Sequence, residues 1–506
     1  MSKDEAQIKR PASVGKKAAS GVVWLLIQSL AGRSSTLLSQ LVLAKLLVPE
    51  DFGVLGLAYT VTTIFNVLVN AGIDQVIQQR HAHMRFWATQ AFWISLGLAT
   101  VATLAMSLSA PIGAAFYHND KIMPLIWLIA ASVPLSTLAT IPQANMQAQM
   151  KFKYLASYGT FDSVGTQLFI ILLAWCGLGA LSFAIPIPVM AAIKAIVFWR
   201  KAPVPLRAVK LSKGWWMIIR RSAMVMGGRI SAALVGQGDY IILGLLATSH
   251  VVGIYYFAFR LSVQPMKILA ANFTNVLFPA LTSMKGEEKR QRDAAFKTAK
   301  FLCVVTVPVC LLQAAVAEPG LVFLFGDRWK ESIRFIQILS LGIPFEVFSW
   351  ASFSLLSARG KFVRLFKYRA FSAIAFYLTV ASFGLVWNAL GVATGVVVYY
   401  AVWPLMLSFL LYYREGIGAK EILMAYFLPF ILGTVSVGAG YLMAQMPLLH
   451  EHYIAQIALA GLVGLGGYAL CLRLFMPEAY WEIQNRVRGL IQKKSGKANL
   501  KQKAKL

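Results

Sequence analysis

Charged residues are scarce in this chain of 506 residues, since Asp, Glu, Lys and Arg together make up only 13% of it. A soluble domain carries about 25%. Hydrophobic residues make up 58% of the chain, and the mean hydropathy is +0.65. The composition therefore excludes an ordinary soluble globular protein and predicts an all-α, polytopic membrane protein.

Cysteine and metal-binding patterns are equally sparse. The four cysteines lie in or beside apolar runs without a CxxC pair or a neighbouring His ligand, so we interpret them as packing residues. There is no GxxxxGK phosphate loop and no HExxH pair. His81 and His83 fall in a basic turn, where a solvated loop is favoured over a metal site. We expect no metal, no cofactor and no catalytic residue.

Long hydrophilic segments are absent too. No segment between apolar runs exceeds about 30 residues, which leaves no place for a soluble catalytic or nucleotide-binding domain. A membrane-embedded polymerase or glycosyltransferase would need an acceptor-binding loop outside the membrane. The sequence therefore predicts a protein that is not an enzyme.

Acidic residues number only 20 against 48 Lys and Arg, giving a net charge of +28. The basic residues sit in short segments between apolar runs, which argues against nucleic acid as a partner. The amino-terminal tail, alternate loops and the carboxy-terminal tail hold 35 of the 48. The opposite loops hold only Lys121, Arg328 and Lys330. Because basic residues accumulate on the cytoplasmic side, both termini are predicted to be cytoplasmic, as in a multi-pass protein of the bacterial inner membrane.

Apolar runs long enough to cross a bilayer predict about fourteen transmembrane helices. They cover residues 20–46, 53–79, 87–117, 121–147, 155–176, 179–199, 215–246, 251–283, 301–326, 332–357, 368–388, 391–413, 422–446 and 453–475. The tail contains a short amphipathic piece, AYWEIQNRVRGLIQ, and a lysine-rich end. We expect it to lie on membrane lipids or to be disordered.

An internal repeat appears at an offset of 200 residues. LAKLLVPEDFGVLGLAYTV at 43–61 aligns with LGLLATSHVVGIYYFAFRL at 243–261, which pairs Gly53 with Gly253 and Ala58 with Ala258. The repeat predicts two pseudo-symmetric six-helix lobes of parallel orientation. The expected organisation is a basic cytoplasmic tail at 1–19, lobes at 20–200 and 215–413 joined by a linker at 201–214, two additional helices at 422–475, and a basic cytoplasmic tail at 476–506.

The stretch 250–284 is apolar enough to span a bilayer yet carries two cations. Helical spacing places Tyr256, Arg260, Gln264 and Lys267 on one face. A charge at the bilayer centre costs roughly 2.5 to 3.5 kcal/mol on insertion scales, so this face requires water, a counter-charge or a ligand. One interpretation is a polar cavity; the other is that both cations pair with carboxylates and only hold the bundle together. Pro265, between the two cations, is either a hinge or a static kink.

Two more polar stripes carry cations. One includes Arg33 and Gln40 in the first predicted helix, and the other includes Arg229 and Tyr240 in the seventh. The four cations Arg33, Arg229, Arg260 and Lys267 predict a cationic central cavity for an anionic substrate, since Arg matches phosphate oxygens. Tyr240 and Tyr256 either stack on sugar rings or only pack helices. The candidates for counter-charge or ion coupling are Asp74, Asp162, Asp239 and Glu346.

Several segments resemble the polysaccharide transporter family, the Wzx-type lipid-linked oligosaccharide flippases, in its colanic acid, O-antigen and exopolysaccharide exporter branch. They are SGVVWLLIQ at 20–28, LAKLLVPEDFGVLGLA at 43–58, VGIYYFAFRLSVQPMKIL at 252–269, NVLFPALTSM at 275–284 and LFGDRW at 324–329. The family belongs to a broader exporter superfamily with multidrug and peptidoglycan-precursor flippases. The resemblance implies two six-helix lobes around a central cavity.

The resemblance also implies a substrate, an undecaprenyl-diphosphate-linked oligosaccharide repeat unit, moved between leaflets by alternating access for surface polysaccharide (lipopolysaccharide or exopolysaccharide) synthesis. Other polysaccharide assembly proteins are expected partners. The four cations match the family's basic cavity but no fixed motif. A multidrug or metabolite antiporter of the same superfamily is the alternative, and it would have an acidic cavity instead.

Overall fold

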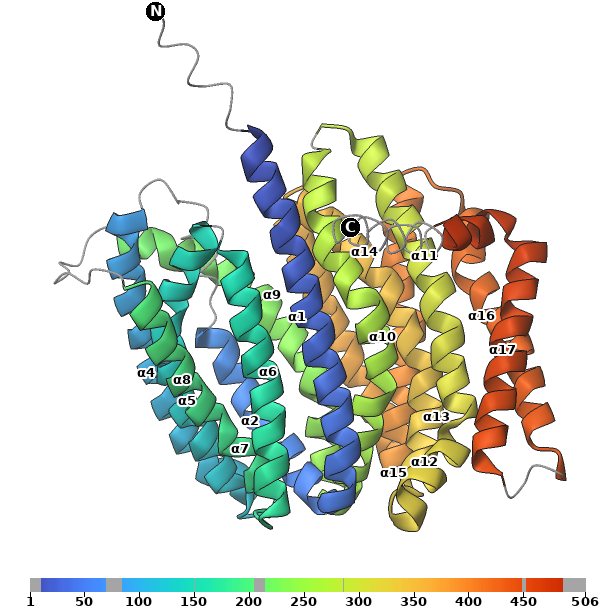
Figure 1. The fold of residues 1–506 in the computed structure, drawn as a ribbon, viewed down its shortest axis with the longest axis horizontal. Coiled ribbons are helices and arrows are strands. Elements are labelled where there is room, and N and C mark those ends of the chain that lie inside the picture. Colours follow the sequence, from blue (N-terminus) through green and yellow to red (C-terminus); the bar gives the residue numbers. More distant parts are fainter. Residues whose placement is uncertain are drawn as a thin grey trace, which may run out of the picture. The chain divides into compact units, whose positions relative to one another are not determined.

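The computed structural model describes residues 11–69, 84–149, 151–203, 214–284, 286–447 and 452–485. These ranges consist of helices and the short turns between them, with no strand. Lipid offers no hydrogen-bond partners, so a chain of this composition must satisfy its backbone groups within each helix. The predicted all-α, polytopic fold is confirmed (Figure 1).

The chain forms two compact units, which are described separately. Unit 1 contains Met1–Gln264 and Gly360–Tyr399, and unit 2 contains Pro265–Arg359 and Tyr400–Leu506. The first boundary falls between Gln264 and Pro265, inside a continuous helix. The predicted division into lobes at 20–200 and 215–413 stays a prediction.

Unit 1 contains the described helices up to the first part of α10, and the first part of α15. They are α1 (Pro11–Leu46), α2 (Pro49–Val69), α4 (Met84–Phe116), α5 (Ile122–Ala148), α6 (Phe152–Trp175), α7 (Leu181–Ala184), α8 (Pro186–Lys201), α9 (Gly214–Leu246), α10 (Ser249–Ser283) up to Gln264, and α15 (Phe362–Arg414) up to Tyr399. Helix α1 packs on α6, and α5 packs on both α4 and α8 (Figure 1). The Trp199 indole of α8 donates a hydrogen bond of 2.8 Å to the Leu138 carbonyl of α5.

The sequence predicts two separate spans at 155–176 and 179–199. The structure has a turn between them, which separates α6 from α7. Gly177 and Gly179 adopt positive φ angles of 80° and 54°. Glycine reaches this region without a Cβ penalty, so two glycines allow the chain to reverse in a few residues.

Helix α15 is a hairpin of two helices. Trp387 and Asn388 inside it have non-helical dihedral angles. A Cβ on Gly395 would lie 2.9 Å from the Cα of Val380, so the two arms lie side by side. The arms correspond to the predicted spans 368–388 and 391–413.

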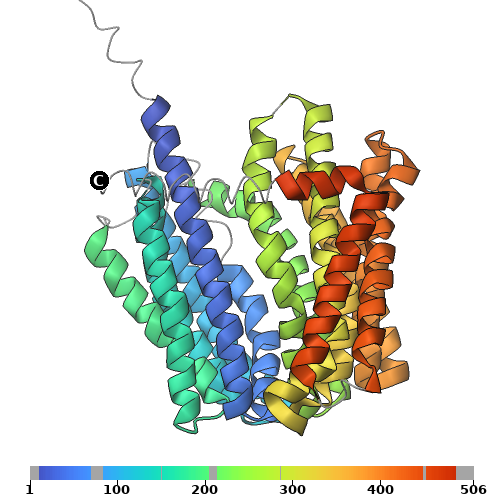
Figure 2. The ribbon, with the colours of Figure 1, turned by 45° about the vertical axis from the view of Figure 1, so that its right-hand side comes forward.

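Unit 2 contains the remaining helices. They are the second part of α10, α11 (Glu288–Ala315), α12 (Ala317–Phe325), η2 (Gly326–Trp329), α13 (Ser332–Gly342), η3 (Ile343–Phe345), α14 (Glu346–Ala358), the end of α15, α16 (Ala419–Ala444) and α17 (Tyr453–Phe475). Helix α16 packs on both α17 and α11. After α17, residues 477–485 form a short helix, which turns across the end of α17 in Figure 2.

Nine helices of the described ranges are long and apolar enough to cross a membrane. One of them, Val363–Arg414, covers both arms of the α15 hairpin. The chain is therefore a multi-pass membrane protein, while the number fourteen stays a prediction.

Candidate functional site

The predicted repeat is visible at the helix ends. Helix α1 ends at Leu46 and α9 at Leu246, while α2 begins at Pro49 and α10 at Ser249. Both pairs differ by 200 residues, as the sequence alignment does. Residues 52–58 and 252–258 are all buried. The two segments therefore have the same local structure and the same burial.

The repeat-related helices α2 and α10 cross at two glycines in unit 1. A Cβ on Gly53 would overlap the carbonyl oxygen of Ser249, and a Cβ on Gly253 would overlap that of Pro49. The contact is reciprocal, because the pairs 53/249 and 253/49 exchange under the 200-residue shift. A reciprocal contact is what a local two-fold axis produces. The sequence pairs these glycines by alignment, and the structure brings them into contact.

Polar contacts surround this crossing. His250 Nδ1 and Glu50 Oε1, again 200 residues apart, are separated by 2.5 Å. Asn119, in the α4–α5 turn, donates to Ser249 Oγ at 2.8 Å. Burial raises the pKa of Glu50, but its own backbone N–H, the hydrogen bond and charge of His250, and Lys121 outweigh this and lower the pKa below its usual range.

Arg260 lies on the phenol ring of Tyr256. Its guanidinium carbon is 4.8 Å from the ring centroid, and the same ring packs against Gly56 of α2. The guanidinium also interacts electrostatically with Tyr59 and Tyr240. Among the described side chains, its electrostatic neighbours are phenols and no carboxylate. Arg260 therefore lies on the face of one aromatic ring, that of Tyr256, and not in an ion pair with a described carboxylate.

The predicted aromatic residues belong to one cluster. Tyr240 is 4% exposed and Tyr256 is 5% exposed. The Tyr240 ring lies 5.6 Å from Tyr255 and 5.5 Å from Tyr256. Gln264, one turn beyond Arg260, is also buried. Tyr240 and Tyr256 pack helices here, and their stacking on sugar stays a prediction.

Asp239 lies beside this cluster. The Tyr255 hydroxyl donates to its Oδ2 at 2.9 Å, and the Tyr240 amide donates to its Oδ1 at 3.0 Å. The residue is 2% exposed. Within the described ranges no ion pair involves Asp239, so a buried carboxyl group is satisfied by hydrogen bonds alone.

Arg33 and Gln40 lie on α1. Arg33 is half-buried, and its Nε donates to Ser29 Oγ at 3.2 Å. Gln40 is 8% exposed. Arg33 is therefore hydrogen-bonded to a side chain of its own helix, one turn away.

Arg229 on α9 has a cationic neighbour that the sequence interpretation missed. Arg369 of α15 interacts electrostatically with Arg229, and its Nη1 donates to the Gly228 carbonyl at 3.3 Å. Arg369 lies at the beginning of the predicted span 368–388, and α15 begins earlier, at Phe362. An anion placed near both guanidinium groups would be attracted by each of them.

The remaining candidates have a neighbour of opposite charge or lie outside the described residues. In unit 2, Lys267 is exposed and interacts electrostatically with Glu346. In unit 1, Asp162 interacts with Lys194. Asp74 lies outside the described residues. In the part of the chain that the structure describes, no cluster of His, Cys, Asp or Glu could hold a metal ion.

These features define a class: a helical, multi-pass membrane protein built on a pseudo-symmetric repeat with arginines on its membrane helices. Its fold resembles that of lipid II flippase MurJ in an inward closed conformation, with a TM-score of 0.72 over 89% of this chain and 99% of that chain, at 14% identity. Residues 42–334, more than half of the chain, match the polysaccharide biosynthesis protein family. The chain belongs to this family.

Two curated relatives agree with this assignment. The chain is 20% identical to teichuronic acid biosynthesis protein TuaB of Bacillus subtilis over 478 residues, which cover 94% of this chain and 98% of the relative. It is 23% identical to succinoglycan biosynthesis transport protein ExoT of Rhizobium meliloti over 301 residues, which cover 59% of this chain and 61% of the relative.

Proposed function

We propose that this chain is a flippase of surface polysaccharide synthesis. It moves an undecaprenyl-diphosphate-linked oligosaccharide repeat unit from the cytoplasmic to the outer leaflet of the bacterial inner membrane by alternating access. Membership of the polysaccharide biosynthesis family supports the pathway, and the transport and flippase names of ExoT and MurJ support the activity.

One observation carries the proposed chemistry: Arg260, in the predicted membrane span 251–283, lies on the phenol ring of Tyr256 and not against a carboxylate. Such an arginine keeps its charge available to an incoming anion. A diphosphate accepts paired N–H donors from guanidinium groups. Arg33 and Arg229 are proposed as further contacts, and Arg369 joins them through its proximity to Arg229.

Lys267 and the acidic residues take other roles in this proposal. Because Lys267 has Glu346 as a neighbour, it binds the diphosphate only as part of a charge pair. Asp239, buried and hydrogen-bonded to Tyr255, is the first candidate for ion coupling. Asp162 is better explained as the counter-charge of Lys194. Asp74 stays a candidate from the sequence.

The orientation proposed is the one that the basic loops favour, with both termini in the cytoplasm. The partners are the lipid-linked substrate, membrane lipids and other polysaccharide assembly proteins. We propose no catalytic step and no cofactor.

A multidrug antiporter is the competing function, and it would require acidic groups where Arg33, Arg229 and Arg260 lie. The test compares Arg260→Ala and Lys267→Ala, alone and combined, for surface polysaccharide at equal protein level. We expect Arg260→Ala to lower export about tenfold, as for the loss of one charge-assisted contact. Unchanged export in the double variant would refute diphosphate docking on these cations, and export of cationic dyes would favour the antiporter.

A further inference from the structure

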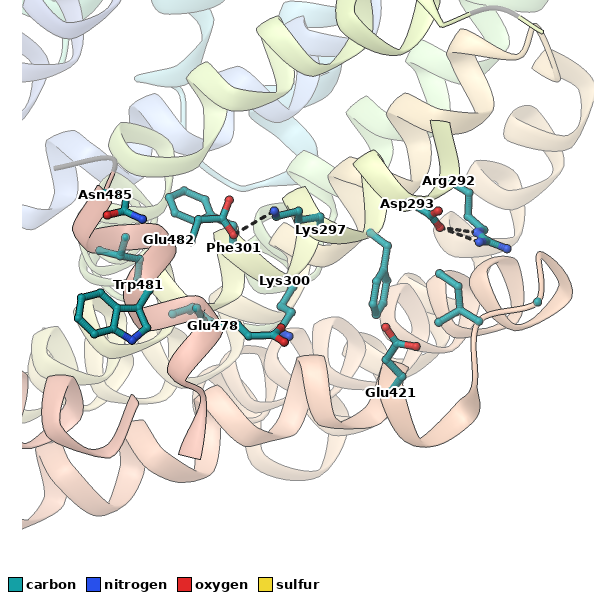
Figure 3. Close-up of a pocket in the computed structure, with 16 residues that line it drawn as sticks. Arg292, Asp293, Lys297, Lys300, Phe301, Glu421, Glu478, Trp481, Glu482 and Asn485 are labelled. Carbon is teal, nitrogen blue, oxygen red and sulfur yellow. Dashed lines mark hydrogen bonds and ion pairs between the residues drawn. The ribbon is translucent and has the colours of Figure 1, made fainter. Parts of the chain in front are cut away.

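Unit 2 contains two adjoining hollows at the beginning of α11 and α16, beside the short helix 477–485. One has a volume of about 930 Å³ and the other about 510 Å³, the size of pockets that hold small molecules. They share four lining residues, Lys300, Glu421, Glu478 and Ala479. Figure 3 shows the larger hollow with α11, α16 and the helix 477–485 around it.

Charged side chains line the larger hollow, and four of them form two ion pairs with each other. Arg292 and Asp293 form an ion pair of 2.7 Å, and Lys297 and Glu482 one of 3.7 Å, both drawn as dashed lines in Figure 3. Trp481, 50% exposed, also lines this hollow. An amphipathic indole next to compensated charges is typical of a membrane–water interface.

The smaller hollow is mainly apolar. Its walls include Met424 and Leu428 of α16 and Phe475 at the end of α17. Both helices are long and apolar enough to span a membrane. Met424 is 48% exposed and Phe475 62% exposed. An apolar hollow at the ends of two such helices is suited to lipid acyl chains.

The border between the hollows carries charges of both signs. Lys300, Glu421 and Glu478 lie there, and Lys420 lines the apolar side. Within the described ranges, no hydrogen bond or ion pair engages the side chains of Lys300, Lys420, Glu421 or Glu478. The site therefore offers two ammonium groups and two carboxylates above an apolar floor.

We propose that this double hollow binds one zwitterionic aminophospholipid of the phosphatidylethanolamine type. The phosphate lies on Lys300 and Lys420, the primary ammonium donates to Glu421 and Glu478, and the acyl chains enter the hollow beside Met424 and Phe475. An anionic phosphatidylglycerol leaves the two carboxylates unmatched. A phosphatidylcholine has no N–H to donate to them.

Bound there, the lipid joins three elements of unit 2 that meet at the hollows. Lys300 belongs to α11, Glu421 to α16, and Glu478 to the helix after α17. The apolar side of that last helix already packs on α16 and α17 through Tyr480 and Ile483. The lipid therefore fixes the polar side of the same helix.

The test uses the full chain in nanodiscs of equimolar phosphatidylethanolamine, phosphatidylglycerol and phosphatidylcholine with identical acyl chains. Native mass spectrometry measures which lipid stays bound after release. The wild type should retain one phosphatidylethanolamine, about tenfold over either other lipid, as expected for charge-assisted hydrogen bonds. Equal retention of the three lipids, or retention of none, overturns the proposal.

Two double variants separate the contribution of the carboxylates from that of the ammonium groups. Glu421→Gln/Glu478→Gln should abolish the preference for phosphatidylethanolamine over phosphatidylglycerol, and Lys300→Gln/Lys420→Gln should lower retention of every lipid about tenfold. An unchanged preference in the glutamate pair refutes the assignment of the ammonium.

The matched control is Glu318→Gln/Lys330→Gln, beyond the other end of α11, which should behave as wild type. Met424→Trp narrows the apolar hollow without altering charge and should lower retention about tenfold. It supplies the test if a charge variant fails to fold, and full retention in it refutes the placement of the acyl chains.

Discussion

Gly53 and Gly253 occupy equivalent positions of the 200-residue repeat and face each other where α2 and α10 cross. The amide nitrogen of Gly253 lies 3.0 Å from a Cβ placed on Gly53, and that of Gly53 lies 2.9 Å from one placed on Gly253. Backbone this close excludes any side chain. The crossing is therefore where the two halves of the repeat contact each other directly.

Alanine at either glycine should disrupt this crossing. We expect Gly53→Ala and Gly253→Ala each to destabilise the protein by about 1 to 3 kcal/mol, the typical cost of overpacking, and to lower export. Thermal unfolding in detergent and surface polysaccharide measure the two effects. Gly97→Ala is the control, because a Cβ there meets nothing within 4 Å. Equal stability in all three variants would contradict the close contact.

The pair Glu50 and His250 beside this crossing should make stability depend on pH. The folded state lowers the Glu50 pKa from its usual 4.5. A carboxyl group with a lowered pKa stabilises the fold at pH values above its unfolded pKa. That contribution is lost as pH falls through the lower, folded pKa.

Thermal unfolding between pH 7 and pH 3 checks this expectation. The melting temperature of the wild type should fall more below about pH 4.5 than that of Glu50→Gln. If both curves fall in parallel, Glu50 has no part in the acid dependence. His250→Gln tests the other partner and should also flatten the curve.

Much of the fold follows from local sequence. Apolar runs of membrane length predict helices because the bilayer leaves the backbone no other way to satisfy its hydrogen bonds. The spans 368–388 and 391–413 correspond to the two arms of α15, although only Trp387 and Asn388 interrupt the helix. Likewise, the alignment of Gly53 with Gly253 identifies two residues that meet in space.

Which side chains become neighbours is less predictable, because it depends on packing between helices distant in sequence. Helical spacing places Tyr256 and Arg260 on one face of α10, but it says nothing about Gly56, which supports the Tyr256 ring from α2. Arg369 lies in a stretch rich in basic residues, so composition alone suggests a loop. The predicted span 368–388 places Arg369 at the start of a helix, but it does not show that Arg229 of α9 is its neighbour.

Arg359 provides a stability test in unit 2. Its Nη1 lies 2.6 Å from Glu415 Oε1, with side chains 4% and 19% exposed, and its Nη2 donates to the Glu288 carbonyl. Removing one partner of a buried pair leaves an uncompensated charge. We expect Arg359→Met to cost about 3 to 5 kcal/mol, and Arg359→Met/Glu415→Leu to recover part of it. A double variant no more stable than the single one would contradict the pair.

Pro265 lies where the chain passes from unit 1 to unit 2 within α10. Proline removes one helical hydrogen bond, which makes this position a suitable hinge. We expect Pro265→Ala to keep the melting temperature and to lower the rate of export about tenfold if chain flexure limits transport. Pro429→Ala, inside α16, is the control. Wild-type export in Pro265→Ala would identify a static proline.

The central claim is that arginines of unit 1 hold the diphosphate of a lipid-linked oligosaccharide while it crosses the membrane. The most direct measurement uses proteoliposomes loaded with an undecaprenyl-diphosphate oligosaccharide, in which a glycan-binding lectin reports the fraction that reaches the opposite leaflet. The wild type should equilibrate the lipid between leaflets. Arg260→Ala and Arg229→Ala/Arg369→Ala should each slow equilibration at least about tenfold. Equilibration at the wild-type rate in both variants would contradict the claim.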